Sequence, residues 1–372
     1  MISKNFLDSI FRKQILALSA YSVADAKNFI KLDAMENPYH WPDALIDTWL
    51  EELRSAELNR YPDPSAAKLV ETLRVVNKIP EQSGLLLGNG SDEIIQLLLM
   101  ALPIGARVLT PEPGFVMYKQ VSLSLDLNFQ GIPLLPESFE LDLPAMLSAI
   151  ERYRPVLIFL AYPNNPTGNL FNPLDIEAIL KVAPGLVVLD EAYAPFANAS
   201  FMDKLKDTPS LLVMRTVSKL GLAGLRLGFI AGHPDIIEQL NKIRLPYNIN
   251  ILTQISAHFA LSNNQVFKAQ TAQICSERSK VMQQLKSFQK VTVYPSAANF
   301  ILFRTPTGQA NTIFNSLKQQ GILIKNLSPQ AGLLSDCLRV TIGTPEENNL
   351  FLKAVKIALD DYKASSQDKL NS

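Results

Sequence analysis

Between residues 85 and 231, short apolar runs alternate with stretches whose apolar residues recur at helical spacing. Strands and helices that alternate in this way are typical of a mostly parallel sheet with helices packed on its faces. The helical stretches include EIIQLLLMAL (93–102) and PLDIEAILKV (173–182), and the second begins with proline, which is favoured in a first helical turn. The predicted strands are Leu85–Leu87, Arg107–Thr110, Val156–Ala161, Leu186–Leu189, Leu211–Arg215 and Leu227–Ala231.

The pattern changes after about Leu252. One long helical stretch (255–288) is followed by short strands at 291–296, 299–304 and 337–344, with a helix near 312–321. This order predicts a second, smaller α/β layer, to which the N-terminal segment up to about Asp43 would contribute. We therefore expect three parts: an N-terminal arm with part of the small domain over 1–43, a large domain over 44–252, and a small C-terminal domain over 253–372.

Polar clusters follow the predicted strands of the larger layer at the point where each strand ends. The clusters are GNGSDE, PEPGF, YPNNPTG, DEAY and TVSK. In open α/β sheets, ligands bind beyond the carboxyl ends of the strands. Because these clusters share that edge, we expect them to converge on one site.

Charge and hydropathy narrow the classes of function. Lysine plus arginine and aspartate plus glutamate number 35 each, so the formal net charge is zero. Nucleic acids and anionic membranes both call for a basic excess, and neither is expected as a partner. No uninterrupted apolar stretch approaches the roughly 20 residues that span a bilayer. The apolar run ILALSA near the start predicts an amphipathic arm rather than a secretion signal.

The two cysteines, Cys275 and Cys337, do not form a CxxC pair. A disulfide framework is therefore not expected, and a reducing cytoplasm is the predicted location. We predict no metal site.

Individual motifs admit both structural and chemical interpretations. Gly88 and Gly90 precede a helix whose free N–H groups suit a phosphate, although for this motif alone a simple turn is the favoured interpretation. Asp190 follows an apolar strand, and a buried carboxylate there needs a cationic or hydrogen-bonded partner. Lys219 lies among leucine and glycine residues and is either a surface residue or a desolvated, nucleophilic amine with Arg226 as a neighbouring cation. Alone, the surface interpretation of the lysine is favoured.

Taken together, the motifs favour the chemical interpretation. A phosphate loop, an aromatic residue, a polar turn, a strand-end acid and a strand-end lysine occur in one order along one sheet edge. Asn165 and Asp190 are 25 residues apart, and Asp190 and Lys219 are 29 residues apart. Each gap has room for about one helix and one strand, so the three side chains can meet.

The chain resembles the fold-type I aminotransferases that use pyridoxal 5′-phosphate (PLP), and within them the histidinol-phosphate aminotransferase subfamily. NPTG, DEAY and SK carry the resemblance to the superfamily. NRYPDP (59–64), GSDE and LRVTIGT (338–344) carry the resemblance to the subfamily, and LDAMENPY (32–39) and SAANFILF (296–303) extend it over nearly the whole chain. The resemblance implies a large PLP-binding domain with a mostly parallel sheet flanked by helices, plus a smaller α/β domain.

The resemblance also implies a cofactor site and a set of catalytic residues. Lys219 would hold PLP as a Schiff base, Asp190 would pair with the pyridine nitrogen, and Tyr193 would bind the ring hydroxyl. The other implied cofactor contacts are Ser91, Asp92, Ser218 and Arg226 at the phosphate, Tyr118 stacked on the ring face, Asn165 at the ring hydroxyl, and Tyr61 at the phosphate of a neighbouring subunit. Lys219 and Arg226 are seven residues apart, where many relatives have eight.

The implied reaction is transamination by a homodimer with shared sites. The amine of L-histidinol phosphate would displace Lys219, the freed lysine would move a proton between Cα and C4′, and hydrolysis would release imidazole-acetol phosphate, a step of L-histidine biosynthesis. Glutamate and 2-oxoglutarate would be the second substrate pair. Asn37 and Arg339 would face the substrate, and Tyr21 is the candidate for its phosphate.

Two other interpretations remain open at this point. One is another PLP enzyme on the same fold, either an aromatic aminotransferase or a decarboxylase of a phosphorylated amino acid. The other is a non-catalytic relative that serves as a binding or regulatory domain. The second is disfavoured, because Asn165, Asp190, Tyr193, Lys219 and Arg339 are all present.

Overall fold

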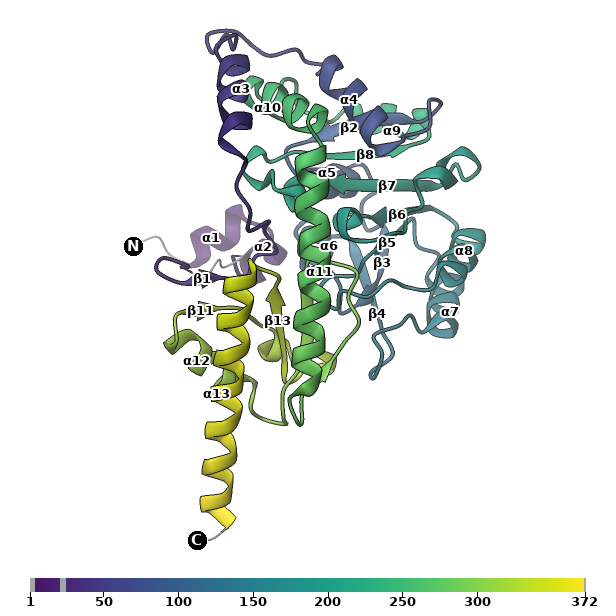
Figure 1. Ribbon diagram of the computed structural model, residues 1–372. Helices are drawn as coiled ribbons and strands as arrows, with labels where there is room; N and C mark the ends of the chain where they lie inside the picture. The colour runs from purple at the N-terminus through teal and green to yellow at the C-terminus, as the bar shows by residue number, and fades with distance from the viewer. Residues whose placement is uncertain (1–3, 21–24, 371–372) are drawn as a thin grey trace.

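A seven-stranded sheet forms the centre of the larger part of the molecule (Figure 1). The computed structural model describes residues 4–20 and 25–370, with side chains for residues 5–20 and 25–360. The strand order is β2-β8-β7-β6-β5-β3-β4, and only β8 runs antiparallel to its two neighbours within this described sheet. The strands are β2 (Gly84–Gly88), β3 (Arg107–Glu112), β4 (Asn128–Pro133), β5 (Leu157–Ala161), β6 (Leu186–Asp190), β7 (Leu211–Thr216) and β8 (Gly228–Gly232).

Alternate side chains of each strand enter two different cores, one on each face of the sheet. In β5, Leu157 and Phe159 pack in one core and Ile158 and Leu160 in the other. This period of two follows from the pleat of a strand, and a strand buried on both faces is continuously apolar. The first core is covered by α5 (Ser91–Met100), α6 (Val116–Ser124) and α9 (Pro234–Asn241), and the second by α4 (Ala67–Asn77), α7 (Leu143–Tyr153), α8 (Pro173–Val182) and α10 (Ile251–Ser262).

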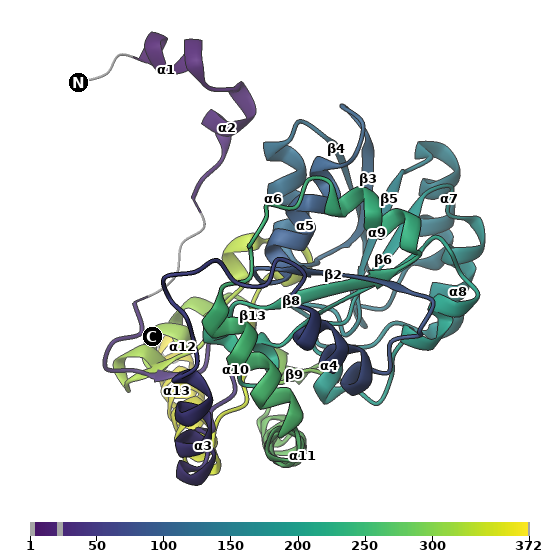
Figure 2. The ribbon, with the colours of Figure 1, turned by 90° about the horizontal axis from the view of Figure 1, so that it is seen from above.

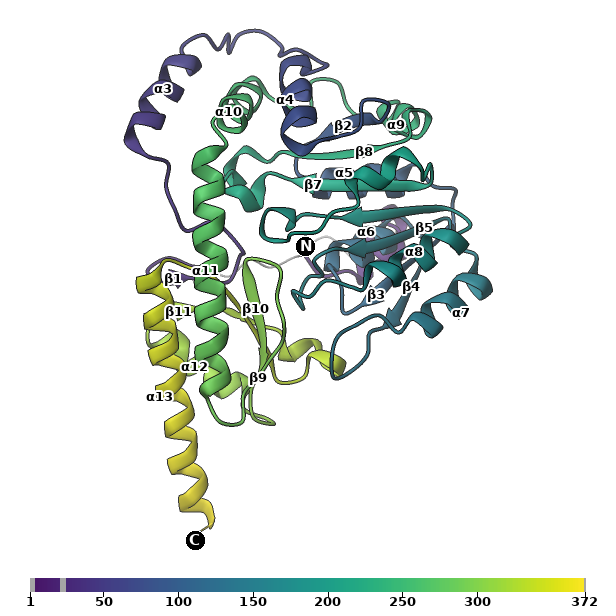
Figure 3. The same cartoon turned by 45° about the vertical axis from the view of Figure 1, so that its right-hand side comes forward.

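The smaller part contains a four-stranded antiparallel sheet with its own core. The long helix α11 passes from the side of the large sheet to the small sheet, as Figure 3 shows. The predicted contribution of the N-terminal segment is present, because β1 pairs in parallel with β11. The elements are α11 (Gln265–Ser287), α12 (Ala310–Gln319), α13 (Pro345–Leu370), β1 (Ile30–Lys31), β9 (Thr292–Val293), β10 (Phe300–Arg304), β11 (Ile322–Leu323), β12 (Lys325–Asn326) and β13 (Cys337–Thr341). The domain bounds themselves stay a prediction.

Three features differ from the sequence-based expectations. Strand β4 was not predicted, because its sequence NFQGIP lacks the apolar run of the central strands. It lies at the edge of the sheet. The helical stretch 255–288 is two helices, which meet at Asn263 and Asn264, where the backbone of Asn263 leaves the helical region. Finally, β8 runs antiparallel, and a strand's direction cannot be read from its own residues.

The N-terminal arm lies at the edge of the protein in Figure 2. It contains α1 (Lys4–Ile10) and α2 (Lys13–Ala17), and Gln14 of α2 donates a hydrogen bond to Asp126 at 2.7 Å. Helix α2 also packs against α6. Helix α3 (Asp43–Leu53) then packs against α10 through a hydrogen bond from Trp49 to Ser256. In the described part of the chain, no helix combines the length and the apolar character needed to cross a membrane.

Candidate active site

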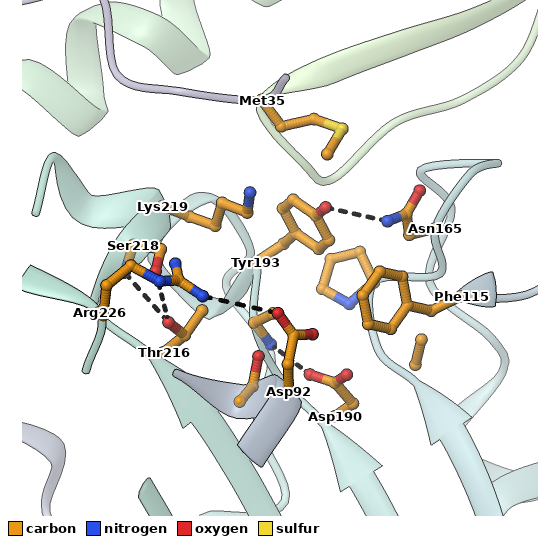
Figure 4. A pocket seen from close by; sticks show the side chains of 14 residues that line it. Met35, Asp92, Phe115, Asn165, Asp190, Tyr193, Thr216, Ser218, Lys219 and Arg226 are labelled. Carbon is orange, nitrogen blue, oxygen red and sulfur yellow. Dashed lines mark hydrogen bonds and ion pairs between the residues drawn. The ribbon is translucent and has the colours of Figure 1, made fainter. Parts of the chain in front are cut away.

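Most of the predicted cofactor residues meet at the edge of the large sheet where the parallel strands end. The pocket at this edge takes Phe115 from beyond β3, Asn165 from beyond β5, Asp190 from the end of β6, and Lys219 from beyond β7. Because β8 is antiparallel, its start lies at the same edge, and Arg226 just before it also lines the pocket. The reversed direction of β8 therefore places Arg226, which precedes β8, beside the residues that follow the parallel strands. Figure 4 shows these side chains around the pocket.

Lys219 extends into the pocket between Tyr193 and the N-terminal segment. Its Nζ lies 5.8 Å from the centroid of the Tyr193 ring and 3.5 Å from the carbonyl oxygen of Ala34. Burial, followed by the nearby cation of Arg339, lowers the pKa of the Lys219 amine to about 8. A larger share of the amine is therefore neutral near physiological pH than in an exposed lysine, and the neutral form is the nucleophile.

Asp190 presents a carboxylate to the pocket from the end of β6. It is 4% exposed, and both oxygens accept hydrogen bonds from neutral donors: Oδ2 from the hydroxyl of Tyr118 at 2.6 Å, and Oδ1 from the backbone N–H of Ala192 at 3.0 Å. Burial raises the pKa of Asp190 to about 6 despite these bonds. A cation placed in the pocket would stabilise the ionised form, because a buried carboxylate lacks the solvation of water.

A chain of side chains links the pocket to the small sheet. The amide nitrogen of Asn165 donates to the hydroxyl of Tyr193 at 3.2 Å, and Arg339 Nη1 donates to Asn165 Oδ1 at 2.6 Å. Arg339 comes from β13, is 7% exposed, and also donates through Nη2 to the carbonyl of Asp33 at 3.2 Å. Three distant segments therefore meet in one hydrogen-bonded group beside Lys219.

An anion-binding cradle forms where α5 begins. Gly90 precedes the helix with φ +87°, and a Cβ at this position would lie 2.8 Å from a guanidinium nitrogen of Arg226. A Cβ on Gly228 of β8 would lie 2.6 Å from the backbone nitrogen of Ser91. These glycines therefore permit the strand and the guanidinium to approach the first free N–H groups of α5, which favour an anion.

Side chains complete this cradle. Arg226 Nη2 lies 3.5 Å from Asp92 Oδ2, and Ser218 shares a hydrogen bond with Thr216 at 2.9 Å. Arg226 adopts a left-handed backbone with φ +49°, which turns its side chain toward the pocket despite the shorter spacing from Lys219. Strained backbone of this kind clusters at functional sites.

The structure separates two aromatic residues that the sequence could not distinguish. Tyr118 was expected to stack on the cofactor ring, but it does not line the pocket; it is 1% exposed and bonds Asp190 from within the core. Phe115 lines the pocket instead, because α6 begins at Val116 and leaves Phe115 at the sheet edge. The signal for Phe115 was its place directly after a strand-end PEPG turn.

Met35 and Thr216 also line the pocket and were missed from the sequence. Met35 has a left-handed backbone, φ +54°, held by a hydrogen bond from its N–H to Thr341 Oγ1 and one from Asn299 to its carbonyl. Its position just before the predicted Asn37 was the available clue. Asn37 itself does not line the pocket; its amide donates to the carbonyl of Leu220 and to Gln270.

Two candidates remain. Tyr61 is 81% exposed and stacks on Tyr247 with ring centroids 4.5 Å apart, away from the pocket of its own chain. Tyr21 falls outside the described residues.

The residues present fit PLP. Its phosphate matches the cradle at the start of α5, its aldehyde matches the desolvated amine of Lys219, and its ring nitrogen, when protonated, matches the buried carboxylate of Asp190. Phe115 provides an aromatic face, and Asn165 with Tyr193 provides polar groups at one side of the pocket.

Comparisons with known proteins agree with this geometry. The family described as aminotransferase class I and II matches residues 27–355 of the chain. A Nitrosococcus oceani protein named histidinol-phosphate aminotransferase 2 is 54% identical over 95% of this chain and 99% of its own length, and a Cupriavidus pinatubonensis protein of the same name is 49% identical over 97% and 100%. The crystal structure of histidinol-phosphate aminotransferase from Sinorhizobium meliloti in complex with pyridoxal-5′-phosphate has a TM-score of 0.84 over 95% of this chain and 98% of its own, at 22% identity.

Proposed function

The chain belongs to the aminotransferase class I and II family, and we propose that it transfers the amino group of L-histidinol phosphate to 2-oxoglutarate. The family assignment confirms three sequence-based expectations: the enzyme class, PLP as cofactor, and the fold-type I architecture. The proposed products are imidazole-acetol phosphate and glutamate, in L-histidine biosynthesis. The choice of substrate is supported by the names of relatives that are about half identical over nearly the full length.

One structural observation carries the chemistry. A desolvated lysine and a buried carboxylate face one pocket from the ends of two neighbouring strands, β7 and β6. An aminotransferase needs both groups, because one must hold and release an aldehyde while the other holds a cationic ring. The non-catalytic interpretation has no use for either feature.

Each side chain has a distinct proposed task. PLP, when bound, supplies an electron sink that stabilises negative charge on the substrate Cα. Lys219 would hold the cofactor through its amine and, once released, carry a proton between Cα and C4′. Asp190 would keep the ring nitrogen protonated, and Asn165 and Tyr193 would fix the ring hydroxyl. At the phosphate, the proposed contacts are Ser91, Asp92, Ser218 and Arg226, with Phe115 replacing Tyr118 on the ring face.

Turnover of three amino donors tests the substrate. L-histidinol phosphate, phenylalanine and O-phosphothreonine would each be supplied with 2-oxoglutarate, and glutamate formation would be measured. We expect the highest kcat/KM for L-histidinol phosphate. Preference for phenylalanine would point to an aromatic aminotransferase. Release of CO₂ from O-phosphothreonine without consumption of 2-oxoglutarate would point to a decarboxylase.

Arg339 is proposed to bind the anionic end of both substrates. Its guanidinium is a planar fork that can hold a carboxylate or a phosphate through two hydrogen bonds. Arg339→Lys should lower kcat/KM of both half-reactions, and Arg339→Ala should lower it further, by about ten- to a hundredfold, because a hydrogen bond to a charged group contributes about 1.5–3 kcal/mol. Single-turnover absorbance changes of the bound cofactor measure each half-reaction.

Arg304→Lys is a matched control for this prediction. Arg304 ends the neighbouring strand β10 and bonds Tyr294 and the carbonyl of Leu333 rather than the pocket. It should leave both half-reactions unchanged. A defect of Arg339 variants confined to the glutamate side would mean that another residue binds the substrate phosphate. Tyr21 would then be the next residue to test.

The active unit is proposed to be a homodimer with shared sites. Tyr61 is exposed on its own chain, stacks on Tyr247 and does not line the pocket of that chain. An exposed pair of aromatic rings is typical of a surface that a partner covers. The phosphate in the partner's site is the proposed target of Tyr61.

Mixing two inactive variants tests the shared site. Tyr61→Phe and Lys219→Ala subunits would be refolded or co-expressed as hybrids, after Tyr61→Phe alone is shown to be severely impaired. One site of the hybrid would contain both lesions and the other neither, so up to about half of the native activity per hybrid should return. Hybrids that form but stay inactive would place the function of Tyr61 within its own chain.

The cytoplasm is the proposed location, without nucleic-acid or membrane partners. The neutral net charge and the small-molecule substrates support this assignment.

A further inference from the structure

Tyr118 contacts Asp190 from within the core, outside the wall of the pocket. It lies in the first turn of α6, is 1% exposed, and stacks on Phe159 of β5 with ring centroids 4.4 Å apart and planes 4° apart. Its hydroxyl donates to Asp190 Oδ2 at 2.6 Å. A hydroxyl–carboxylate bond of this length belongs to the strong, charge-assisted class. The stack fixes the ring, and the bond therefore fixes one carboxylate oxygen.

Several neighbouring groups raise or lower the pKa of Asp190. Burial raises its pKa, and the acidic side chains of Asp92 at the start of α5 and of Glu191, next in the chain, raise it further. The hydroxyl of Tyr118 has the largest effect among the groups that lower the pKa, ahead of the backbone N–H of Ala192. Burial and the Asp190 charge raise the pKa of Tyr118 well above its ordinary value, so the phenol stays a donor. The nearby phenol of Tyr193 also raises the pKa of Tyr118.

We propose that Tyr118 is a positioning residue that holds Asp190 ionised, so that the proton shared by Asp190 and the PLP ring nitrogen stays on the nitrogen. The inference rests on the proposed function, because it requires PLP in the pocket. Without the phenol, Asp190 would be a stronger base, and the shared proton would move toward the carboxylate. The ring would then withdraw fewer electrons, and turnover would fall.

Tyr118→Phe separates this role from packing. The phenylalanine ring keeps the stack on Phe159 and loses only the hydroxyl. A lost hydrogen bond to a charged group shifts the pKa of its acceptor by about one to two units, so the proton balance should move about ten- to a hundredfold toward Asp190.

The direct readout is the ¹⁵N resonance of the ring nitrogen in holoenzyme loaded with ring-¹⁵N PLP. In the native protein at pH 7.5 the resonance should lie at the protonated position. In Tyr118→Phe it should move toward the unprotonated position at the same pH, with kcat falling by at most about a hundredfold. An unchanged resonance with bound PLP overturns the proposal, whatever happens to kcat.

Two comparisons control the experiment. Tyr294→Phe removes the hydroxyl of another buried tyrosine, which accepts a hydrogen bond from Arg304 in the small sheet, and it should leave the resonance in place. In an Asp190→Asn background, Tyr118→Phe should change PLP affinity by less than about twofold, because no carboxylate remains to be held. Equal losses of affinity in both backgrounds would show that Tyr118 acts independently of Asp190.

A second substitution covers the case in which Tyr118→Phe fails to fold. Site-specific 3-fluorotyrosine at position 118 keeps the ring and strengthens the donor, so Asp190 becomes a weaker base and the shared proton should be lost at a lower pH than in the native protein. No change in that titration would contradict the proposal. If the native protein did not bind PLP at all, the proposed function would be contradicted. That result differs from an unchanged resonance in a variant with bound PLP, which contradicts only the role of Tyr118.

Discussion

Lys219→Ala should fold and lose at least about a thousandfold in multiple-turnover transamination, because both the covalent attachment of PLP and the proton transfer at Cα depend on this amine. Circular dichroism shows whether the variant folds, and the rate of glutamate formation measures its transamination activity. Lys242→Ala, which removes an exposed lysine at the end of α9, is the matched control and should keep full activity. Borohydride reduction followed by peptide mapping should find the cofactor on Lys219; a label on another lysine would refute the assignment.

The rate at which the protein captures PLP should depend on pH through the same amine. The pKa of Lys219 is about 8, so at pH 7.5 about a quarter of it is neutral, compared with about one part in a thousand for an ordinary lysine. Capture should accelerate as pH rises to about 8 and level off above it. Stopped-flow absorbance after mixing apoprotein with PLP measures this rate. Continued acceleration up to pH 10 would mean that Lys219 is not desolvated.

Asp190→Asn should lower kcat by about 10²–10³-fold while the fold is retained, because an amide cannot hold a protonated ring nitrogen by charge. The loss should lie in the step that removes the Cα proton, which a kinetic isotope effect with Cα-deuterated donor would reveal. Near-normal turnover would remove the assigned role. Glutamate formation at saturating substrate measures kcat directly.

The same variant should not destabilise the protein without cofactor at pH 8. The folded-state pKa of Asp190 is raised to about 6, so the stability that its protonated form provides is present below the unfolded pKa near 4 and is lost as pH rises through 6. Above pH 6 the buried, ionised carboxylate therefore lowers the free energy of unfolding of the native chain by up to about 3 kcal/mol. Asp190→Asn has no such charge and avoids this loss. Denaturant titrations at pH 5 and 8 measure the difference, and a variant less stable than the native apoprotein at pH 8 would contradict this account.

The strand-end motifs could be located from local sequence. An apolar run that ends in DEAY or TVSK specifies both a strand and the side chains at its carboxyl end, and the parallel topology then brings Asp190 and Lys219 together. Strand parity also assigns Asp190 to the face that α5 and α6 cover, since it lies two positions after the buried Val188 and therefore on the same face of β6. The architecture and the centre of the candidate site could thus be predicted.

The contacts of particular side chains depended on residues far away in the chain. Phe115 and Tyr118 are three positions apart, and the start of α6 at Val116 decides that the first reaches the pocket and the second reaches Asp190. Asn37 is held by Gln270, 233 positions away, rather than directed at a substrate. Such pairings arise only when separate elements pack.

The sequence by itself determined the order of elements, the polar edge of the sheet and the residue types available there, because hydrophobic period and strand termination are local properties. Tertiary structure decided that β8 runs antiparallel, which brings Arg226 to Asp92, and that Arg339 of β13 meets Asn165 of the large sheet. Both outcomes depend on which strands pair and on how two cores pack together. Those are free-energy differences between whole arrangements of the chain, and no short segment contains them.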